Sequence, residues 1–93
     1  MIFITGGSGF IGRALVHHLT ALGYPVYRLN RTLELPCFTN SSTDDNIIIH
    51  CAWAGVLGKD RNSYDIQMEN LSLTHKVIAL ANTISARRVI AFG

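Results

Sequence analysis

The residues whose types and spacing could do chemistry lie at the start of the chain, in a glycine-rich segment, residues 5–12. This segment reads Thr-Gly-Gly-Ser-Gly-Phe-Ile-Gly, follows the apolar run 1–4 and precedes an amphipathic run that reaches Leu22. A strand, a glycine turn and a helix in this order form a phosphate-binding element, because unpaired N–H groups and the positive end of the helix dipole attract an anion. The segment therefore predicts a dinucleotide ligand, and a strand–helix turn without a ligand is the competing interpretation.

Each glycine of this segment has its own expected role. Gly6 allows the tight turn out of the strand, Gly9 lets the backbone approach a pyrophosphate, and Gly12 lets the helix lie close to the sheet. Ser8 stands where the commoner G-x-G-x-x-G fingerprint has a glycine, so it either hydrogen-bonds a phosphate or shapes the turn. A P-loop is excluded, because that motif has lysine after its last glycine and this chain has Arg13.

The end of the second expected strand, residues 26–29, bears on the choice between two dinucleotides. An acidic residue about 20 positions beyond the glycines binds the ribose 2′-hydroxyl of NAD and would repel the 2′-phosphate of NADP. No acidic residue stands there: residues 28–31, at the end of the strand, read Arg-Leu-Asn-Arg, so that Asn30 lies between Arg28 and Arg31. A guanidinium group grips a phosphate with a planar fork of donors. We therefore expect NADP, with NAD as the alternative if the two arginines are ordinary surface cations.

Alternating apolar patterns indicate an α/β fold, a Rossmann-like parallel sheet of about four strands with two main helices. The β-branched run Ile47–Ile49 is the strongest strand signal. Gly23 predicts the end of the first helix, and Asn62 or Ser63 predicts the N-cap of the second. The expected strands are residues 1–5, 26–29, 47–52 and 88–92, the expected helices are residues 10–22 and 63–85, and residues 30–46 are expected to be mainly loop.

Composition narrows the class of protein. Ninety-three residues make one small domain at most, and the net charge of +2 is not gathered into a basic stripe, so nucleic-acid binding is not expected. Cys37 and Cys51 have no metal-binding spacing. The N-terminus does not resemble a signal peptide, and the longest apolar run, residues 47–58, is too short to cross a bilayer. A cytoplasmic protein without a metal site and without a membrane partner is the expectation.

With these motifs in view, the chain resembles the extended short-chain dehydrogenase/reductase family of NAD(P)-dependent nucleotide-sugar epimerases and dehydratases. Residues 5–12 are similar to the opening motif T-G-x-x-G-F-I-G. Residues 49–54, Ile-His-Cys-Ala-Trp-Ala, resemble the strand-four motif H-L-A-A, whose backbone lies along the cofactor. Residues 70–74 resemble the helix motif N-x-x-G-T, with Leu73 where glycine is common. The expected cofactor-binding residues are Gly6, Ser8, Gly9, Phe10, Ile11, Gly12, Arg28, Asn30, Arg31, Ala52, Trp53, Ala54 and Asn70.

Three of the polar or aromatic residues have two interpretations. Asn70 interrupts an apolar helical stripe, and it either holds the cofactor loop near residues 52–54 or ties the helix to the sheet as a buried amide. Trp53 either packs beside a nicotinamide or sugar, or packs in the loop. His50, in the central strand, is expected to be a hydrogen-bonded core histidine rather than a catalytic one.

The resemblance also implies groups that these residues lack. The family follows its fifth strand with a Ser or Thr and a Tyr-x-x-x-Lys pair, in which the tyrosine is the general acid/base, and then a substrate domain. None of the three tyrosines, Tyr24, Tyr27 and Tyr64, has lysine four positions later. We therefore expect residues 1–93 to be a truncated, partial NAD(P)-binding domain with no catalytic residues, inactive alone.

The resemblance implies that the parent protein is an epimerase, dehydratase or reductase acting on a nucleotide sugar or a similar substrate. A non-catalytic module that senses NAD(P), or a non-functional remnant of such an enzyme, are the alternatives. The last strand should leave an open sheet edge, and the apolar surfaces of the sheet and of the long helix should lack partners, which predicts a homo-oligomer or aggregation through the edge and the helix.

Overall fold

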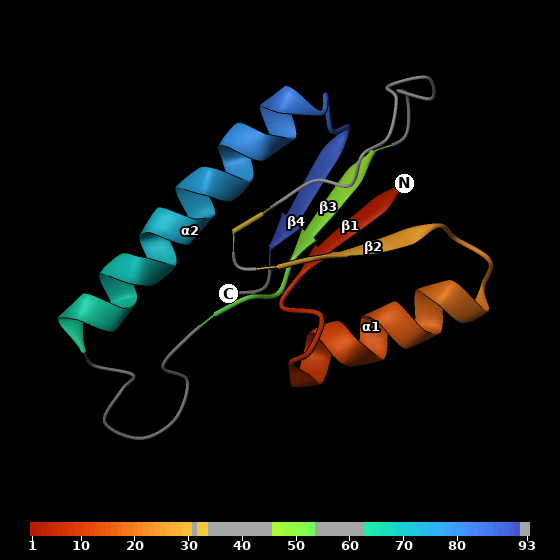
Figure 1. The fold of residues 1–93 in the computed structure, drawn as a ribbon, viewed down its shortest axis with the longest axis horizontal. Coiled ribbons are helices and arrows are strands. Elements are labelled where there is room, and N and C mark those ends of the chain that lie inside the picture. Colours follow the sequence, from red (N-terminus) through yellow and green to blue (C-terminus); the bar gives the residue numbers. More distant parts are fainter. Residues whose placement is uncertain (31, 34–45, 54–62, 92–93) are drawn as a thin grey trace.

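The computed structural model describes residues 1–30, 32–33, 46–53 and 63–91 (Figure 1). These residues form a parallel α/β sheet with two helices, so the expected fold class is confirmed. Every element lies within two residues of its expected limits. In chain order the elements are β1 (Ile2–Thr5), α1 (Phe10–Ala21), β2 (Val26–Leu29), β3 (Ile47–His50), α2 (Tyr64–Thr83) and β4 (Arg88–Ala91).

The sheet has the strand order β2-β1-β3-β4, and every neighbouring pair is parallel. β1 therefore lies beside both β2 and β3, with Ile2 in register with Val26 on one side and Ile47 on the other. β2 is added on one side of β1, and β3 and then β4 are added on the other side, so the direction in which strands are added reverses between β1 and β3. A crevice forms at such a switch point, outside the carboxyl ends of the two central strands.

The hydrophobic core lies mainly between the sheet and α2. Phe3 and Ile48 are paired in register, so they share a face of the sheet, and both are fully buried. Val77 of α2 and Ile84, the residue just after this helix, pack against this face. The opposite face is covered by α1, which contacts β1 and β2, and Figure 1 shows the two helices flanking the sheet. Gly12 is the one fully buried residue of α1, so this helix is the more lightly packed of the two.

The ends of both helices follow local chemistry. Of the two expected N-caps, Ser63 is the one observed, and its hydroxyl accepts a hydrogen bond from the N–H of Ile66 at 3.4 Å. Gly23, just beyond α1, has φ +91°, the left-handed conformation that ends a helix. Within the described residues, no helix is both long and apolar enough to span a lipid bilayer.

Asn46 holds together three segments at the amino ends of the strands. Its side chain is 4% exposed; Oδ1 accepts from the amino group of Met1 at 3.3 Å, and Nδ2 donates to the carbonyl of Ile84 at 3.1 Å. Its own carbonyl accepts from the N–H of Arg87 at 2.7 Å. One residue thus joins the start of β1, the start of β3 and the connection from α2 to β4. The sequence pattern placed Asn46 only at the end of an expected loop, residues 30–46.

Replacing Asn46 by Ala should destabilise the fold by about 1–3 kcal/mol, because the Ile84 carbonyl and the Met1 amino group lose a partner. Urea unfolding followed by circular dichroism measures this loss as a lower midpoint. Asn82→Ala, at an exposed position of α2, is the matched control and should unfold near the wild-type midpoint. Equal midpoints for the two variants would contradict the role given to Asn46.

Candidate functional site

The glycine turn lies against the chain that leaves β3. Gly6 has φ +69°, and a Cβ atom placed on it would lie 2.7–2.8 Å from backbone atoms of Cys51 and Ala52. A side chain at this position would therefore both strain the turn and push it off the neighbouring strand. The expected role of Gly6 in the tight turn is confirmed, and its close approach to Ala52 adds a second requirement.

The turn leads directly into the open end of α1. The N–H of Gly9 donates to the carbonyl of Gly6 at 3.0 Å, and the N–H of Arg13 donates to the carbonyl of Gly9 at 2.9 Å. The amides of residues 10–12 precede the first intrahelical hydrogen bond, so they are the donors that a helix N-terminus offers to an anion. The first turn of α1 contains no acidic residue that would compete for these donors.

Two glycines of the turn differ in what surrounds them. A Cβ atom on Gly12 would collide with the carbonyl oxygen of Gly6, so Gly12 lets α1 approach the turn. The nearest atoms belong to residues 6 and 7, directly after β1, and the expectation that Gly12 lets the helix lie close to the sheet stays a prediction. Among the described residues, the one atom within 4 Å of a Cβ placed on Gly9 would be the Gly6 carbonyl oxygen, at 3.4 Å. With respect to this part of the chain, Gly9 thus faces open space at the helix mouth.

A groove of about 880 Å³ lies between the glycine turn, the ends of β2 and β3, and the first half of α2. The structure brings eight of the expected cofactor-binding residues together along it: Gly6, Ser8, Gly9, Arg28, Asn30, Ala52, Trp53 and Asn70. The groove lies at the switch point between β1 and β3, where the strand order predicts a ligand crevice.

Five expected residues do not line this groove as described. Phe10 and Ile11 are 88% and 47% exposed, and neither lines the groove. Gly12 is buried beneath the turn. Arg31 and Ala54 lie outside the described residues.

The groove also includes residues that the sequence did not single out for it. These are Thr5, Gly7, Leu29, Leu33, Cys51, Glu69 and Leu73. Glu69 directly precedes Asn70, the first residue of the helix motif, so the motif could have pointed to it. Gly7 lies in the glycine-rich segment, which was the signal for it, whereas Leu33 enters the groove through tertiary packing, for which the sequence has no pattern. Burial raises the pKa of the Cys51 thiol, so it stays protonated at neutral pH.

Asn30 builds the turn that follows β2. Its Oδ1 accepts hydrogen bonds from the N–H and the hydroxyl of Thr32, at 3.1 and 2.8 Å. A side-chain oxygen that bonds the backbone two residues later is a common turn device. At the end of β2, Asn30 therefore stands where a carboxylate would bind a ribose hydroxyl, and its side-chain oxygen already accepts two hydrogen bonds from Thr32.

A buried hydrogen-bond chain fixes the backbone that borders the groove. The hydroxyl of Thr5 accepts from the N–H groups of Cys51 and Ala52, at 3.1 and 3.2 Å. It also lies 2.7 Å from Nδ1 of His50. With two donors already pointing at the oxygen, we assign the Thr5 proton to the bond with Nδ1, which makes Nδ1 an acceptor.

That assignment places the His50 proton on Nε2. Nε2 lies 3.4 Å from the hydroxyl of Thr74, and this hydroxyl donates to the carbonyl of Asn70 at 3.0 Å. The chain thus connects β1 through β3 to α2, and His50 is 3% exposed. The expectation of a hydrogen-bonded core histidine is confirmed. Desolvation by burial lowers the pKa of His50, which favours the neutral ring that the chain requires.

The side chain of Asn70 is also buried, at 3% exposed. Its Nδ2 donates to Oε1 of Gln67 at 3.3 Å, and it lines the groove. Both expected roles of Asn70 stay predictions. Within the described residues, nowhere do three His, Cys, Asp or Glu side chains gather as a metal site.

Comparison with known proteins gives matches over nearly the whole chain. The model of the NAD dependent epimerase/dehydratase family matches residues 2–93. The sterol-4-alpha-carboxylate 3-dehydrogenase, decarboxylating, of Dictyostelium discoideum is 26% identical over 110 aligned residues, which cover 98% of this chain and 33% of that protein. The solved structure of the NAD dependent NDP-hexosamine 5,6-dehydratase TunA, involved in tunicamycin biosynthesis, has a TM-score of 0.71 and 22% identity.

That structural match covers 97% of this chain and 35% of the TunA chain. At this identity it shows a shared fold. The chain spans about a third of the length of both relatives.

The stability of the protein should fall as the pH drops below about 6.5, the ordinary pKa of an unfolded histidine. In that range the unfolded chain protonates His50 while the folded chain does not, so protons favour unfolding until the lowered folded pKa is reached. Above this range the contribution is constant. Urea unfolding between pH 8 and about pH 5 measures the slope.

His50→Gln should flatten this slope, and His75→Gln, at an exposed position of α2, should keep it. Parallel stability curves for wild type and His50→Gln would exclude a contribution of the buried imidazole.

Proposed function

Because the chain belongs to the NAD dependent epimerase/dehydratase family, we propose that residues 1–93 bind a nicotinamide dinucleotide in the groove beside Gly9, with NADP favoured over NAD. The observation that carries this proposal is the open space at Gly9, directly at the mouth of α1. The main-chain N–H groups of residues 10–12 would hold the pyrophosphate there, and the absent side chain of Gly9 would let it approach.

Support for NADP comes from the end of β2. Arg28 lines the groove, and its side-chain carbons lie against Gly7, where a Cβ atom would be 2.9 Å from Cδ. Asn30, in the place of the acid that reads a ribose hydroxyl, is engaged with Thr32. A 2′-phosphate would meet a cation and no adjacent carboxylate of β2, whereas a 2′-hydroxyl would lack its usual acceptor.

When bound, the coenzyme accepts a hydride from a substrate carbon and can return it. The residues of this chain would bind and orient it, and Trp53, 45% exposed at the groove, would offer an aromatic face. Since no tyrosine precedes lysine by four positions, we propose that proton transfer and substrate binding are not carried by residues 1–93. For this reason an NAD(P)-sensing module stays the second candidate.

We propose that the substrate of the whole protein is a nucleotide sugar or a similar molecule. The name of TunA as an NDP-hexosamine dehydratase supports this class. The Dictyostelium relative is named for a sterol carboxylate instead, so the names of the relatives support the coenzyme class more than the substrate class.

Titration of the purified protein with NADPH and NADH, followed by nucleotide fluorescence, tests the coenzyme proposal. We expect NADPH to bind about tenfold more tightly, a difference of about 1.4 kcal/mol. Gly9→Leu should abolish binding of both nucleotides, because its side chain would fill the helix mouth. It should still fold, because a Cβ atom there makes only an ordinary contact.

Ala14→Leu, an added side chain on an exposed position of α1, is the control and should bind like wild type. Unchanged affinity of Gly9→Leu would refute the phosphate cradle, and a tenfold preference for NADH would refute the choice of NADP.

We also propose that the protein self-associates through β4. This strand lies at an edge of the sheet, all four of its residues are exposed, and Val89 and Ile90 are 43% and 44% exposed. An apolar edge invites pairing with another strand, and a lysine on the edge opposes it. Val89→Lys should therefore lower the molar mass seen by light scattering, whereas Ile78→Lys on α2 should not. Monomeric wild type at high concentration would contradict the proposal.

A further inference from the structure

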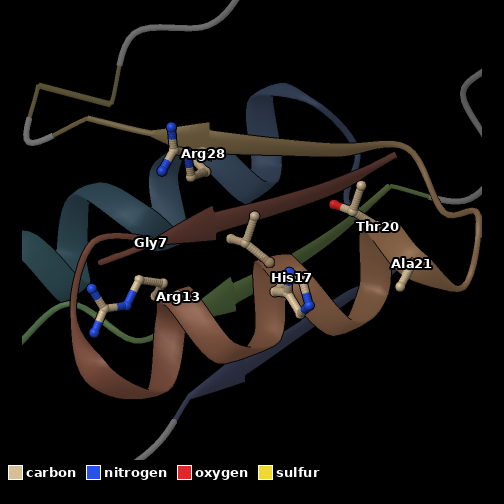
Figure 2. A pocket seen from close by; sticks show the side chains of 7 residues that line it. Gly7, Arg13, His17, Thr20, Ala21 and Arg28 are labelled. Carbon is tan, nitrogen blue, oxygen red and sulfur yellow. The ribbon is translucent and has the colours of Figure 1, made fainter.

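A second hollow lies beside the groove, between α1 and β2. Its volume is about 390 Å³, and Arg13 and His17 of α1 line it together with Arg28 of β2. Figure 2 shows Arg13 and Arg28 at one end of this hollow, on either side of Gly7, and Thr20 at the other end. Arg13 and His17 are four positions apart, so they lie on the same side of the helix.

The hollow and the groove share two lining residues, Gly7 and Arg28. The stem of Arg28 lies against Gly7, where a Cβ atom would be 2.9 and 3.0 Å from Cδ and Cγ. Arg28 therefore stands at the boundary between the two spaces. A ligand that follows the groove to the end of β2 would reach the hollow at the position where the two arginines flank Gly7.

The hollow is cationic. It is lined by two arginines and a histidine, with no acidic side chain among its described residues. The carboxylates within the described residues, Asp65 and Glu69, both belong to α2, which packs on β3 and β4 instead. No hydrogen bond or ion pair joins Arg13 or Arg28 to another described side chain. Two guanidinium groups at one end of a hollow repel each other unless an anion lies between them.

The position of Arg13 in α1 is a second, independent observation. It is the fourth residue of the helix, close to the positive end of the helix dipole, where a cation is unfavourable and an acid is preferred. Helix stability therefore gives no reason for an arginine here. A bound anion would offset the repulsion between the guanidinium and the helix end.

We propose that this hollow receives the 2′-phosphate of an NADP-type nucleotide, and that Arg13 determines specificity by gripping this phosphate together with Arg28. The inference rests on the proposed coenzyme function and adds a residue to it. A phosphate carries about two negative charges, and a planar guanidinium fork on each side satisfies its oxygens better than one arginine does. The pyrophosphate at the helix mouth would not depend on Arg13, because main-chain amides hold it.

The test compares NADPH with NADH, which differ only in the 2′-phosphate, on wild type, Arg13→Ala and Lys76→Ala. Arg13→Ala should weaken NADPH binding by about tenfold or more and leave NADH binding within about twofold. Arg13→Lys, which keeps the charge without the fork, should give an intermediate loss. Lys76→Ala removes the same charge from an exposed position of α2 and should change neither affinity.

Adenosine 2′,5′-bisphosphate, as a competitor, should follow the NADPH pattern, because it keeps the 2′-phosphate without the nicotinamide. Arg13→Ala should not lower the urea midpoint, since it removes a cation from a helix N-terminus, so lost binding would not reflect lost folding. A wild-type preference for NADPH that survives in Arg13→Ala would overturn the role of Arg13 and keep the coenzyme proposal. Wild type that binds neither nucleotide would overturn both.

Discussion

The hydroxyl of Thr5 is the group on which the geometry of the groove depends. It receives the N–H groups of Cys51 and Ala52 and donates to His50, so the last residue of β1 fixes the backbone that leaves β3. Since Gly6 packs directly on Ala52, the turn and this backbone can only move together. Parallel strands whose carboxyl ends are tied in this way present a rigid wall to a ligand.

The elements of the fold were predictable because each has a local cause. The β-branched run at Ile47 predicts a strand wherever it is placed, Gly23 can adopt the left-handed conformation, and Ser63 can bond an orphan amide of the helix that follows. The glycine turn was predictable for the same reason, since the spacing of its glycines between a strand and a helix is itself a local pattern. Residues 34–45 and 54–62 lie outside the described part of the chain.

The relations that the sequence did not predict all join distant segments. In the sequence, Asn46 is only the last residue of an expected loop. The sheet order brings Met1, Ile84 and Arg87 into hydrogen-bonding distance of it. In the sequence, Arg13 served only to exclude a P-loop. The packing of α1 beside β2 places it in one hollow with Arg28. Register and strand order, which the sequence constrains weakly, decide both relations.

The light packing of α1 has a consequence for how the molecule behaves in time. Gly12 is the one buried residue of this helix, and it lies in the first turn, beside the anion donors. An element with few buried contacts opens at low cost, and a ligand that binds only the closed form slows that opening. Amide hydrogen exchange along α1 would therefore report how strongly the proposed coenzyme orders this helix.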